Sequence, residues 1–465
     1  MPAAVHYEPS RRTAVLLLVG ITVLAAALRL TGLSDQSIWF DEAATAGQVS
    51  GSLLEVITRT AGDNYPPLYN LIAWPFSQPF GGADWSLRLP AALLGIVNVP
   101  VLYLLVSRVG GRSAGLVAAL LLTLSSFHLW YSHEARMYSL LALAATSHAL
   151  AVLCWLERQS RRRNWALVLS GAALLLSHPY GALVWFSIAA GALLATPRPL
   201  AGAPLRSFLR REATSFAIFA LWGLMLLWRA YTVVARGSWL PEPTPGYLGE
   251  QLHYITGGLW LPLLLGAALT FYRPAPGVAQ SRVLFLLWAL APIVAGALLS
   301  MVLAPVFVGR YFIGCLPAMF ALAALGISPW IRRPVHLVGA MTLVVVAGVV
   351  SLLYASPPPR PNWRAVVQHV VETRPAESCA FVDPGYNGRT WSYFDPEGCR
   401  RGLQGIAKYL AENPRGTVYL AIEVRTTLVQ PPFDQIPNHK LVHTERFDDI
   451  DLYTLVPTGS DTVHP

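Results

Sequence analysis

Long apolar segments constrain this chain more than any other feature of its sequence. A helix needs about 20 mainly apolar residues to cross the hydrocarbon core of a bilayer. About eleven segments approach that length. They lie near residues 13–31, 87–107, 113–130, 137–156, 165–179, 181–196, 214–231, 256–272, 283–303, 311–330 and 335–355. The sequence therefore predicts a polytopic α-helical membrane protein.

The charge content agrees with a membrane location. Of 465 residues, 13% are charged and 54% are hydrophobic, whereas a soluble globular protein carries about 25% charged residues. A net charge of +9 would suit nucleic-acid binding, but the arginines stand between apolar runs and form no continuous basic face. We therefore expect the lipid bilayer as a partner and no nucleic acid.

The arginines also predict the orientation, because cytoplasmic loops carry an excess of Lys and Arg. Alternate loops hold most of them: Arg108, Arg112, Arg158, Arg161 to Arg163, Arg198, Arg206, Arg210, Arg211, Arg273, Arg282, Arg332 and Arg333. The N-terminus is then cytoplasmic, and the loop 32–86 and the C-terminal segment lie outside. The bias toward Ala, Leu and Arg is typical of a bacterium rich in G and C, which predicts a multi-pass protein of the cell inner (plasma) membrane.

The composition changes to that of a soluble protein after a proline-rich linker at 356–361. We expect a transmembrane domain over 1–355 and a small extracytoplasmic α/β domain over 356–465. The expected helices cover 363–373 and 403–412, and the expected strands cover 417–424, 440–446 and 451–456. Cys379 and Cys399 fall in this outer domain, where a disulfide is favoured over two free thiols.

Polar residues at the outer ends of the spans are the functional candidates. The run from Trp39 to Ala43 places two adjacent carboxylates, Asp41 and Glu42, directly after the first span. The run could be a solvated helix start with Asp41 near the N-cap, or it could supply a general base at the membrane surface.

Four further polar clusters share the outer side. They are Asp63 to Tyr69 with its paired prolines, Tyr131 to Tyr138, Ser177 to Tyr180, and Gly309 to Tyr311. A carboxylate can take a proton from an attacking hydroxyl, and arginines can hold a phosphate and stabilise it as a leaving group. A lipid phosphate would reach such a site through the bilayer.

These motifs resemble those of the C-type glycosyltransferases, specifically the glycosyltransferase family 39 group related to protein O-mannosyltransferases and, more distantly, to the lipid A aminoarabinose transferases. The resemblance rests on the runs 39–43, 65–69 and 132–138, on Arg310-Tyr311 with Leu316-Pro317, and on Asn362-Trp363-Arg364.

The resemblance implies an inverting transfer of a monosaccharide from a polyprenyl-phosphate donor to a lipid, glycan or protein acceptor. It implies Asp41 as the catalytic base, with Glu42 and Glu134 as supporting acids. Arg136 and Arg310 would bind the donor phosphate. The pocket would be lined by Tyr65, His133, Tyr138, His178 and Tyr311.

The chain departs from the group in two places. The aminoarabinose transferase pattern has Glu-Lys before its paired prolines, where this chain has Asn64-Tyr65. We therefore assign no metal ligand, although a divalent metal stays compatible with the pattern. The lumenal domain inserted in eukaryotic protein mannosyltransferases is absent, so a protein acceptor does not follow from the resemblance.

Two alternative functions remain at this stage. A polytopic transporter or lipid flippase would show internal repeats and charges deep within its spans, whereas the polar clusters here lie at span ends. A non-catalytic assembly or sensor protein would use the C-terminal domain as its binding module.

Overall fold

The structure is a computed structural model that describes residues 6–195, 202–234, 241–272, 278–302, 305–354, 360–424 and 438–459, with Phe433 and Ile436. Its contacts divide the chain into two units. The helical unit contains residues 1–31, 51–79 and 88–357, and the outer unit contains 32–50, 80–87 and 358–465. Two segments of the loop 32–86 thus group with the C-terminal domain. The expected linker at 356–361 lies almost wholly outside the described residues.

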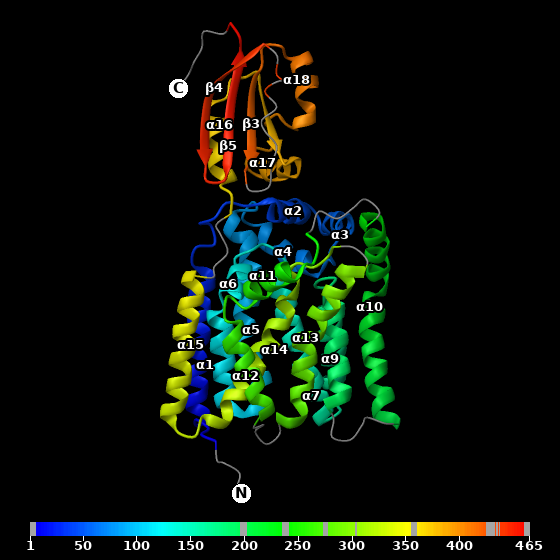
Figure 1. Ribbon diagram of the computed structural model, residues 1–465. Helices are drawn as coiled ribbons and strands as arrows, with labels where there is room; N and C mark the ends of the chain where they lie inside the picture. The colour runs from blue at the N-terminus through cyan, green and yellow to red at the C-terminus, as the bar shows by residue number, and fades with distance from the viewer. Residues whose placement is uncertain are drawn as a thin grey trace. The chain divides into compact units, whose positions relative to one another are not determined.

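Helices make up the helical unit, and those of the bundle run side by side in Figure 1. Their bounds are α1 Arg11–Leu30, α3 Leu53–Ala61, α4 Leu68–Ser77, α5 Asp84–Leu124 (from Arg88 on), α6 Ser126–Ser132, α7 Tyr138–Glu157, α8 Arg161–Leu175, α9 Gly181–Ala195, α10 Gly202–Val234, α11 Pro245–Ile255, α12 Trp260–Tyr272, α13 Val278–Val302, α14 Leu316–Ile327 and α15 Pro334–Tyr354. A short 3-10 helix, η1 Gly309–Cys315, precedes α14, and η2 Ser328–Trp330 follows it.

Six helices of the described chain are long and apolar enough to cross a membrane. The prediction of a polytopic helical membrane protein is confirmed, while the number of about eleven crossings stays a prediction. Helix α5 has 41 residues and would be about 61 Å long if straight, twice the hydrocarbon thickness. It breaks at Gly111, whose φ is 81°. The break separates the two segments in which the sequence predicts separate spans.

A buried arginine joins α1 to the C-terminal end of α5 and to α6. Arg29, fully buried in α1, donates to the carbonyl oxygens of Leu122 and Thr123 at 3.0 and 3.2 Å. These carbonyls lie in the last turn of α5, where backbone acceptors have no partner within the helix. The Arg29 guanidinium also lies 3.1 Å from His128 Nδ1 in α6. We therefore assign Arg29 a capping role.

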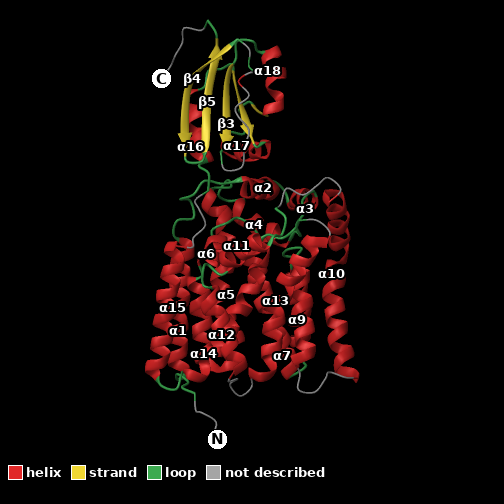
Figure 2. Cartoon of the chain, in the orientation of Figure 1, coloured by secondary structure: helices red, strands yellow, loops and turns green. Residues whose placement is uncertain are grey.

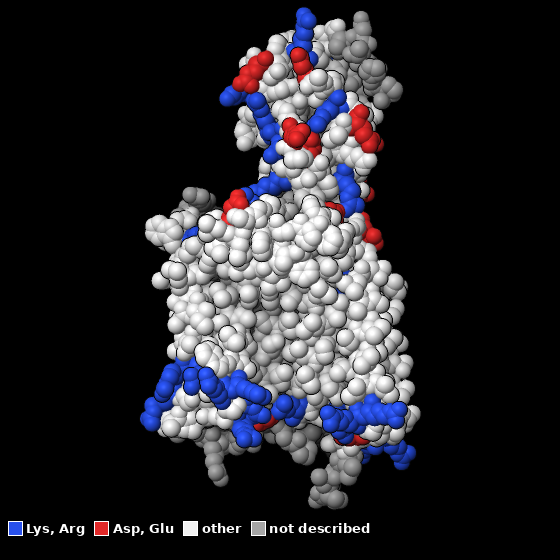
Figure 3. Space-filling view, turned by 180° about the vertical axis from the view of Figure 1, so that it is seen from behind, with Lys and Arg blue, Asp and Glu red and all other residues white. Residues whose placement is uncertain are grey.

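Basic residues gather at one end of the helical unit, where Figure 3 shows Lys and Arg as a band. Within the helical unit, Arg108 pairs with Glu157 at 2.7 Å, and Arg112 pairs with Glu8 at 3.5 Å. The predicted orientation would place this band on the cytoplasmic side, and that orientation stays a prediction.

The outer unit contains a five-stranded mixed sheet in the order β2-β1-β3-β5-β4. Strands β2 and β3 lie parallel to β1, and β5 lies antiparallel to both β3 and β4. The strands are β1 Ser378–Asp383, β2 Arg400–Gly402, β3 Thr417–Glu423, β4 His439–Phe447 and β5 Ile450–Pro457. The helices are α2 Phe40–Val49, α16 Trp363–Thr373, α17 Gly388–Phe394 and α18 Ile406–Glu412. The predicted small α/β domain is therefore confirmed.

Helices cover both faces of this sheet (Figure 2). Side chains alternate along a strand, so Ala380 and Val382 of β1 pack with Trp363 and Trp391 of α16 and α17. The intervening Phe381 packs on the other face with Ile406 and Tyr409 of α18. A sheet buried on both faces explains why β3 is buried at every position.

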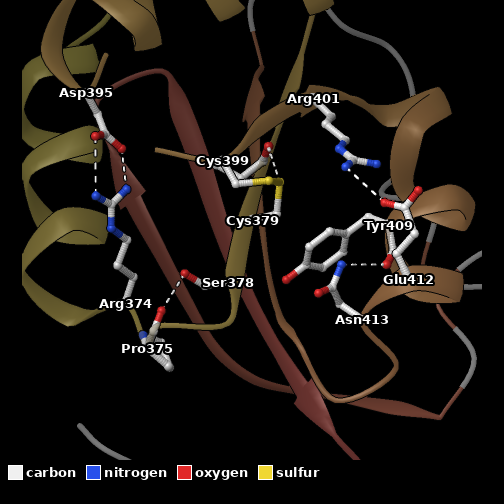
Figure 4. The surroundings of a disulfide bond; sticks show 11 residues. Arg374, Pro375, Ser378, Cys379, Asp395, Cys399, Arg401, Tyr409, Glu412 and Asn413 are labelled. Atoms are coloured by element: carbon white, nitrogen blue, oxygen red, sulfur yellow. Dashed lines mark hydrogen bonds and ion pairs between the residues drawn. A yellow bond between two sulfur atoms is a disulfide. The ribbon is translucent and has the colours of Figure 1, made fainter. Parts of the chain in front are cut away.

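The disulfide expected between Cys379 and Cys399 is present. It joins β1 to the residue before β2, and Ala380 N donates to Cys399 O at 3.0 Å. Figure 4 shows it between two ion pairs, Arg374 with Asp395 and Arg401 with Glu412. Strand β2 has the sequence Arg-Arg-Gly, which carries little strand preference. The covalent link therefore holds in place an edge strand that its own residues would not.

Replacing both cysteines by alanine should destabilise the outer unit by about 2–4 kcal/mol, because the unfolded chain gains the freedom that the 20-residue link removes. We expect faster tryptic cleavage after Arg400 and Arg401, measured on the intact protein in detergent. The double variant Cys154→Ala, Cys315→Ala, which removes the free thiols of the helical unit, is the control. Equal cleavage of parent and disulfide variant would show that the bond does not stabilise β2.

Candidate functional site

Four predicted aromatic residues meet in the helical unit. The ring of His178 lies with its centroid 4.8 Å from that of Tyr311, 5.4 Å from Tyr65 and 6.2 Å from Tyr138. The hydroxyl oxygens of Tyr65 and Tyr311 are 3.3 Å apart. We call these four residues the aromatic cluster. Its members come from the segment before α4, the start of α7, the α8–α9 turn and η1, so packing of distant segments creates it.

Both predicted phosphate-binding arginines lie at the aromatic cluster. The guanidinium carbon of Arg136 lies 4.6 Å from the centroid of the Tyr65 ring, and that of Arg310 lies 5.7 Å from the Tyr311 ring. These distances are within the range of cation–π contacts. The charges of Arg136 and Arg310 also both act on His178. Two arginines near one histidine can bind an anionic ligand.

His178 has a defined hydrogen-bonding role. The backbone N–H of Tyr180 donates to its Nδ1 at 3.0 Å, so the proton of the neutral ring is on Nε2. The residue is 1% exposed, and its Nε2 has no hydrogen-bond partner among the described residues. An N–H donor buried beside two arginines is suited to an oxygen atom of a bound anion.

The predicted residues Glu134 and His133 lie in the turn between α6 and α7. Glu134 is buried, and Tyr131 interacts electrostatically with both Glu134 and Arg310. Tyr131 also stacks edge-to-face on Tyr138 at 4.8 Å, so Glu134 borders the aromatic cluster. His133 makes a different contact, because its Nε2 lies 3.1 Å from the carbonyl oxygen of Leu28 in α1.

Hydrogen bonds from neighbouring helices to backbone groups hold the segments that carry the aromatic cluster. Trp222 of α10 donates to the carbonyl of Tyr65 at 3.2 Å, and Gln251 of α11 accepts from Gly309 N at 2.8 Å. A Cβ at Gly181 would lie 2.2 Å from the Leu174 carbonyl oxygen, so the tight turn that presents His178 requires glycine there.

Sequence reasoning missed Tyr254 of α11 and gave no role to Tyr180. The Tyr254 hydroxyl lies 2.8 Å from that of Tyr131, and nothing in its local sequence marks it. The Tyr180 ring lies 5.1 Å from Tyr311, and its hydroxyl donates to Val306 O at 2.5 Å. Its place directly after His178-Pro179 was a usable signal.

The acidic pair belongs to the outer unit, in the first turn of α2. Carboxylates in a first helical turn are stabilised by the helix dipole. Asp41 is partly exposed, whereas Glu42 is fully buried and pairs with Arg360 at 2.8 Å. The adjacent carboxylates therefore have different surroundings, and Glu42 is engaged in an ion pair.

No group of three or more His, Cys, Asp or Glu side chains is arranged to hold a metal ion within the part of the chain that the structure describes. We therefore name no metal ligands.

Comparison with known proteins agrees with the predicted resemblance. The family model described as dolichyl-phosphate-mannose-protein mannosyltransferase matches residues 64–228, a range that includes Tyr65, Glu134, Arg136 and His178. No curated protein sequence matches the chain at a significant level.

Solved structures share the fold. The crystal structure of ArnT from Cupriavidus metallidurans in the apo state superposes with a TM-score of 0.65 at 12% identity, covering 96% of this chain and 98% of ArnT. The same protein bound to undecaprenyl phosphate gives 0.59 at 14% identity with the same coverage. AglB, an oligosaccharyltransferase of Archaeoglobus fulgidus in complex with an inhibitory peptide and a dolichol-phosphate, gives 0.55 at 12%, covering 89% and 69%. The resemblance to C-type glycosyltransferases is confirmed, and at these identities the structures establish the shared fold.

Proposed function

We propose that the protein is an inverting glycosyltransferase that moves a monosaccharide from a polyprenyl-phosphate donor to an acceptor on the outer face of the membrane. One observation carries this proposal. Arg136 and Arg310 lie at the aromatic cluster, in which the Nε2–H of His178 has no hydrogen-bond partner among the described residues. The matching family and the ArnT structure with undecaprenyl phosphate support a lipid-phosphate ligand there.

The donor phosphate binds at this cluster. The guanidinium groups of Arg136 and Arg310 neutralise the phosphate charge, which grows as the bond from the sugar to the phosphate breaks. His178 donates Nε2–H to a phosphate oxygen. The rings of Tyr65 and Tyr311 keep both guanidinium groups in place by cation–π contact.

The acceptor is activated by Asp41. Its carboxylate takes the proton of the acceptor hydroxyl while the hydroxyl oxygen attacks the anomeric carbon from the side opposite the phosphate. The new glycosidic bond forms as the phosphate leaves, so the configuration inverts. Glu134 assists from the border of the aromatic cluster, and Glu42, by its ion pair, fixes the helix that carries Asp41.

The membrane arrangement follows the positive-inside rule. We propose about eleven crossings of the inner membrane, a cytoplasmic N-terminus and an extracytoplasmic domain over 356–465. The basic band of Figure 3 supports this orientation.

The test is turnover of donor by the purified protein in detergent. The panel contains synthetic polyprenyl phosphates that carry mannose, glucose, arabinofuranose or aminoarabinose. We expect slow hydrolysis of one donor without an acceptor, since water can replace the acceptor hydroxyl. A folded parent that hydrolyses none, and transfers none to crude membrane lipid, would contradict the proposal.

A transporter or lipid flippase is the competing function. It predicts movement of a labelled polyprenyl-phosphate sugar across proteoliposome membranes with the sugar–phosphate bond intact. Recovery of intact donor in the opposite leaflet, without hydrolysis, would favour that function.

A further inference from the structure

We propose that the C-terminal domain acts as the positioning element for Asp41, through an ion pair between Arg360 and Glu42. This inference rests on the proposed function, because it assigns Asp41 the role of base. It identifies Arg360 as a positioning residue and gives the outer domain a task in catalysis.

The ion pair has the burial that a positioning contact needs. Arg360 Nη1 lies 2.8 Å from Glu42 Oε2, and the side chains are 7% and 0% exposed. Removing one partner of a buried ion pair is unfavourable, so we expect Glu42 to shift when Arg360 is neutralised. Glu42 follows Asp41 directly in the first turn of α2. Any shift of Glu42 therefore moves the Asp41 backbone.

The residues before Asp41 are held in the same way. The Arg360 guanidinium carbon lies 6.0 Å from the centroid of the Trp39 ring. Phe40 packs edge-to-face on Tyr386 with centroids 5.0 Å apart, and Arg389 lies 5.5 Å from the Phe40 ring. The side chain of every neighbour of Asp41 in the run from Trp39 to Glu42 thus contacts the C-terminal domain.

A second anchor fixes the chain that leads into α2. Arg364 of α16 donates its backbone N–H to Ser37 Oγ at 3.0 Å and its guanidinium to Ser34 O at 3.0 Å. It also pairs with Asp84, whose other carboxylate oxygen accepts from the Tyr393 hydroxyl at 2.7 Å. The Asn-Trp-Arg motif at 362–364 therefore supplies this second anchor.

A fixed Asp41 matters because a base must lie within hydrogen-bond reach of the proton it removes. Loss of the Arg360 contact would loosen α2 without touching the arginines of the helical unit. We therefore expect Arg360→Gln to lower kcat about 10-fold to 100-fold and to leave the KM for the donor within about two-fold of the parent value.

The experiment combines kinetics with hydrogen–deuterium exchange on the full-length protein in detergent. Arg360→Gln should speed exchange of the peptide covering 37–49 and leave exchange of β3 unchanged. Arg360→Lys, which keeps the charge, should restore most of both properties. Arg401→Gln, which removes an exposed ion pair of the same domain, should change neither.

The pair is confirmed as a unit if the double variant Glu42→Gln, Arg360→Gln is no slower than the worse single variant. Unchanged hydrogen–deuterium exchange over 37–49 in Arg360→Gln would show that the ion pair with Glu42 does not hold α2 in place. This outcome can be read whether or not the protein turns over a donor. Faster exchange with an unchanged kcat would overturn the positioning role. Failure of the parent to use any donor, with the exchange result as expected, would instead count against the proposed function.

Discussion

Asp41→Asn should lower donor hydrolysis and sugar transfer about 10³-fold while the protein still folds. An amide has the shape of the carboxylate but cannot take the proton of an attacking hydroxyl. Asp41 is partly exposed in the first turn of α2, and asparagine has nearly the same size, so we expect the free energy of unfolding to change by about 1 kcal/mol at most. Initial rates and a thermal unfolding scan of both proteins measure the two effects.

Asp35→Asn is the matched control, because Asp35 is an exposed aspartate of the same unit, six positions away by its number. It should keep the parent rate. Asp41→Glu should recover part of the activity, since it restores a carboxylate at a longer reach. Transfer by Asp41→Asn at the parent rate would show that another group is the base, and Glu134 would then be the next candidate.

Arg136→Gln and Arg310→Gln should each lower kcat/KM for the donor by about 10²-fold, the second largest effect we expect. Each change removes a positive charge from the aromatic cluster, where both arginines act on His178. The phosphate becomes more negative as the sugar leaves, so kcat should fall along with donor affinity. Rates over a range of donor concentrations separate the two contributions.

Substitution by lysine distinguishes charge from shape at these sites. Lysine keeps the charge but loses the planar, forked guanidinium, so Arg136→Lys should be intermediate between parent and Arg136→Gln. Arg282→Gln, which removes an arginine that packs on Phe271, should be neutral. Equal rates for the parent and both glutamine variants would show that the donor phosphate does not bind at the aromatic cluster.

The sequence predicted those elements whose own residues carry a clear apolar, amphipathic or strand-forming pattern. Apolar length predicted the six helices of the described chain that are long and apolar enough to cross a membrane, and the amphipathic pattern over 363–373 predicted α16 with its observed bounds. The predicted strands agree with β3, β4 and β5 to within a residue or two at each end. Each of these segments carries a strong signal in its own residues.

The elements that sequence reasoning missed depend on partners elsewhere. Strand β2 is Arg-Arg-Gly and pairs only because β1 lies beside it. Strand β1 includes Ser378, Cys379 and Ala380, none of which favours a strand strongly. In the candidate site, motifs located the arginines and His178, but neither motif nor spacing could reveal that Arg360 pairs with Glu42. The two residues are 318 positions apart.

That separation has a consequence for biosynthesis. A chain grows at about 5–20 residues per second, so α2 is made roughly 16–64 seconds before Arg360 leaves the ribosome. During this interval Glu42 lacks its ion pair with Arg360. The outer unit can therefore assemble only after every membrane helix has been made, and a nascent chain halted before residue 360 should leave α2 open to protease.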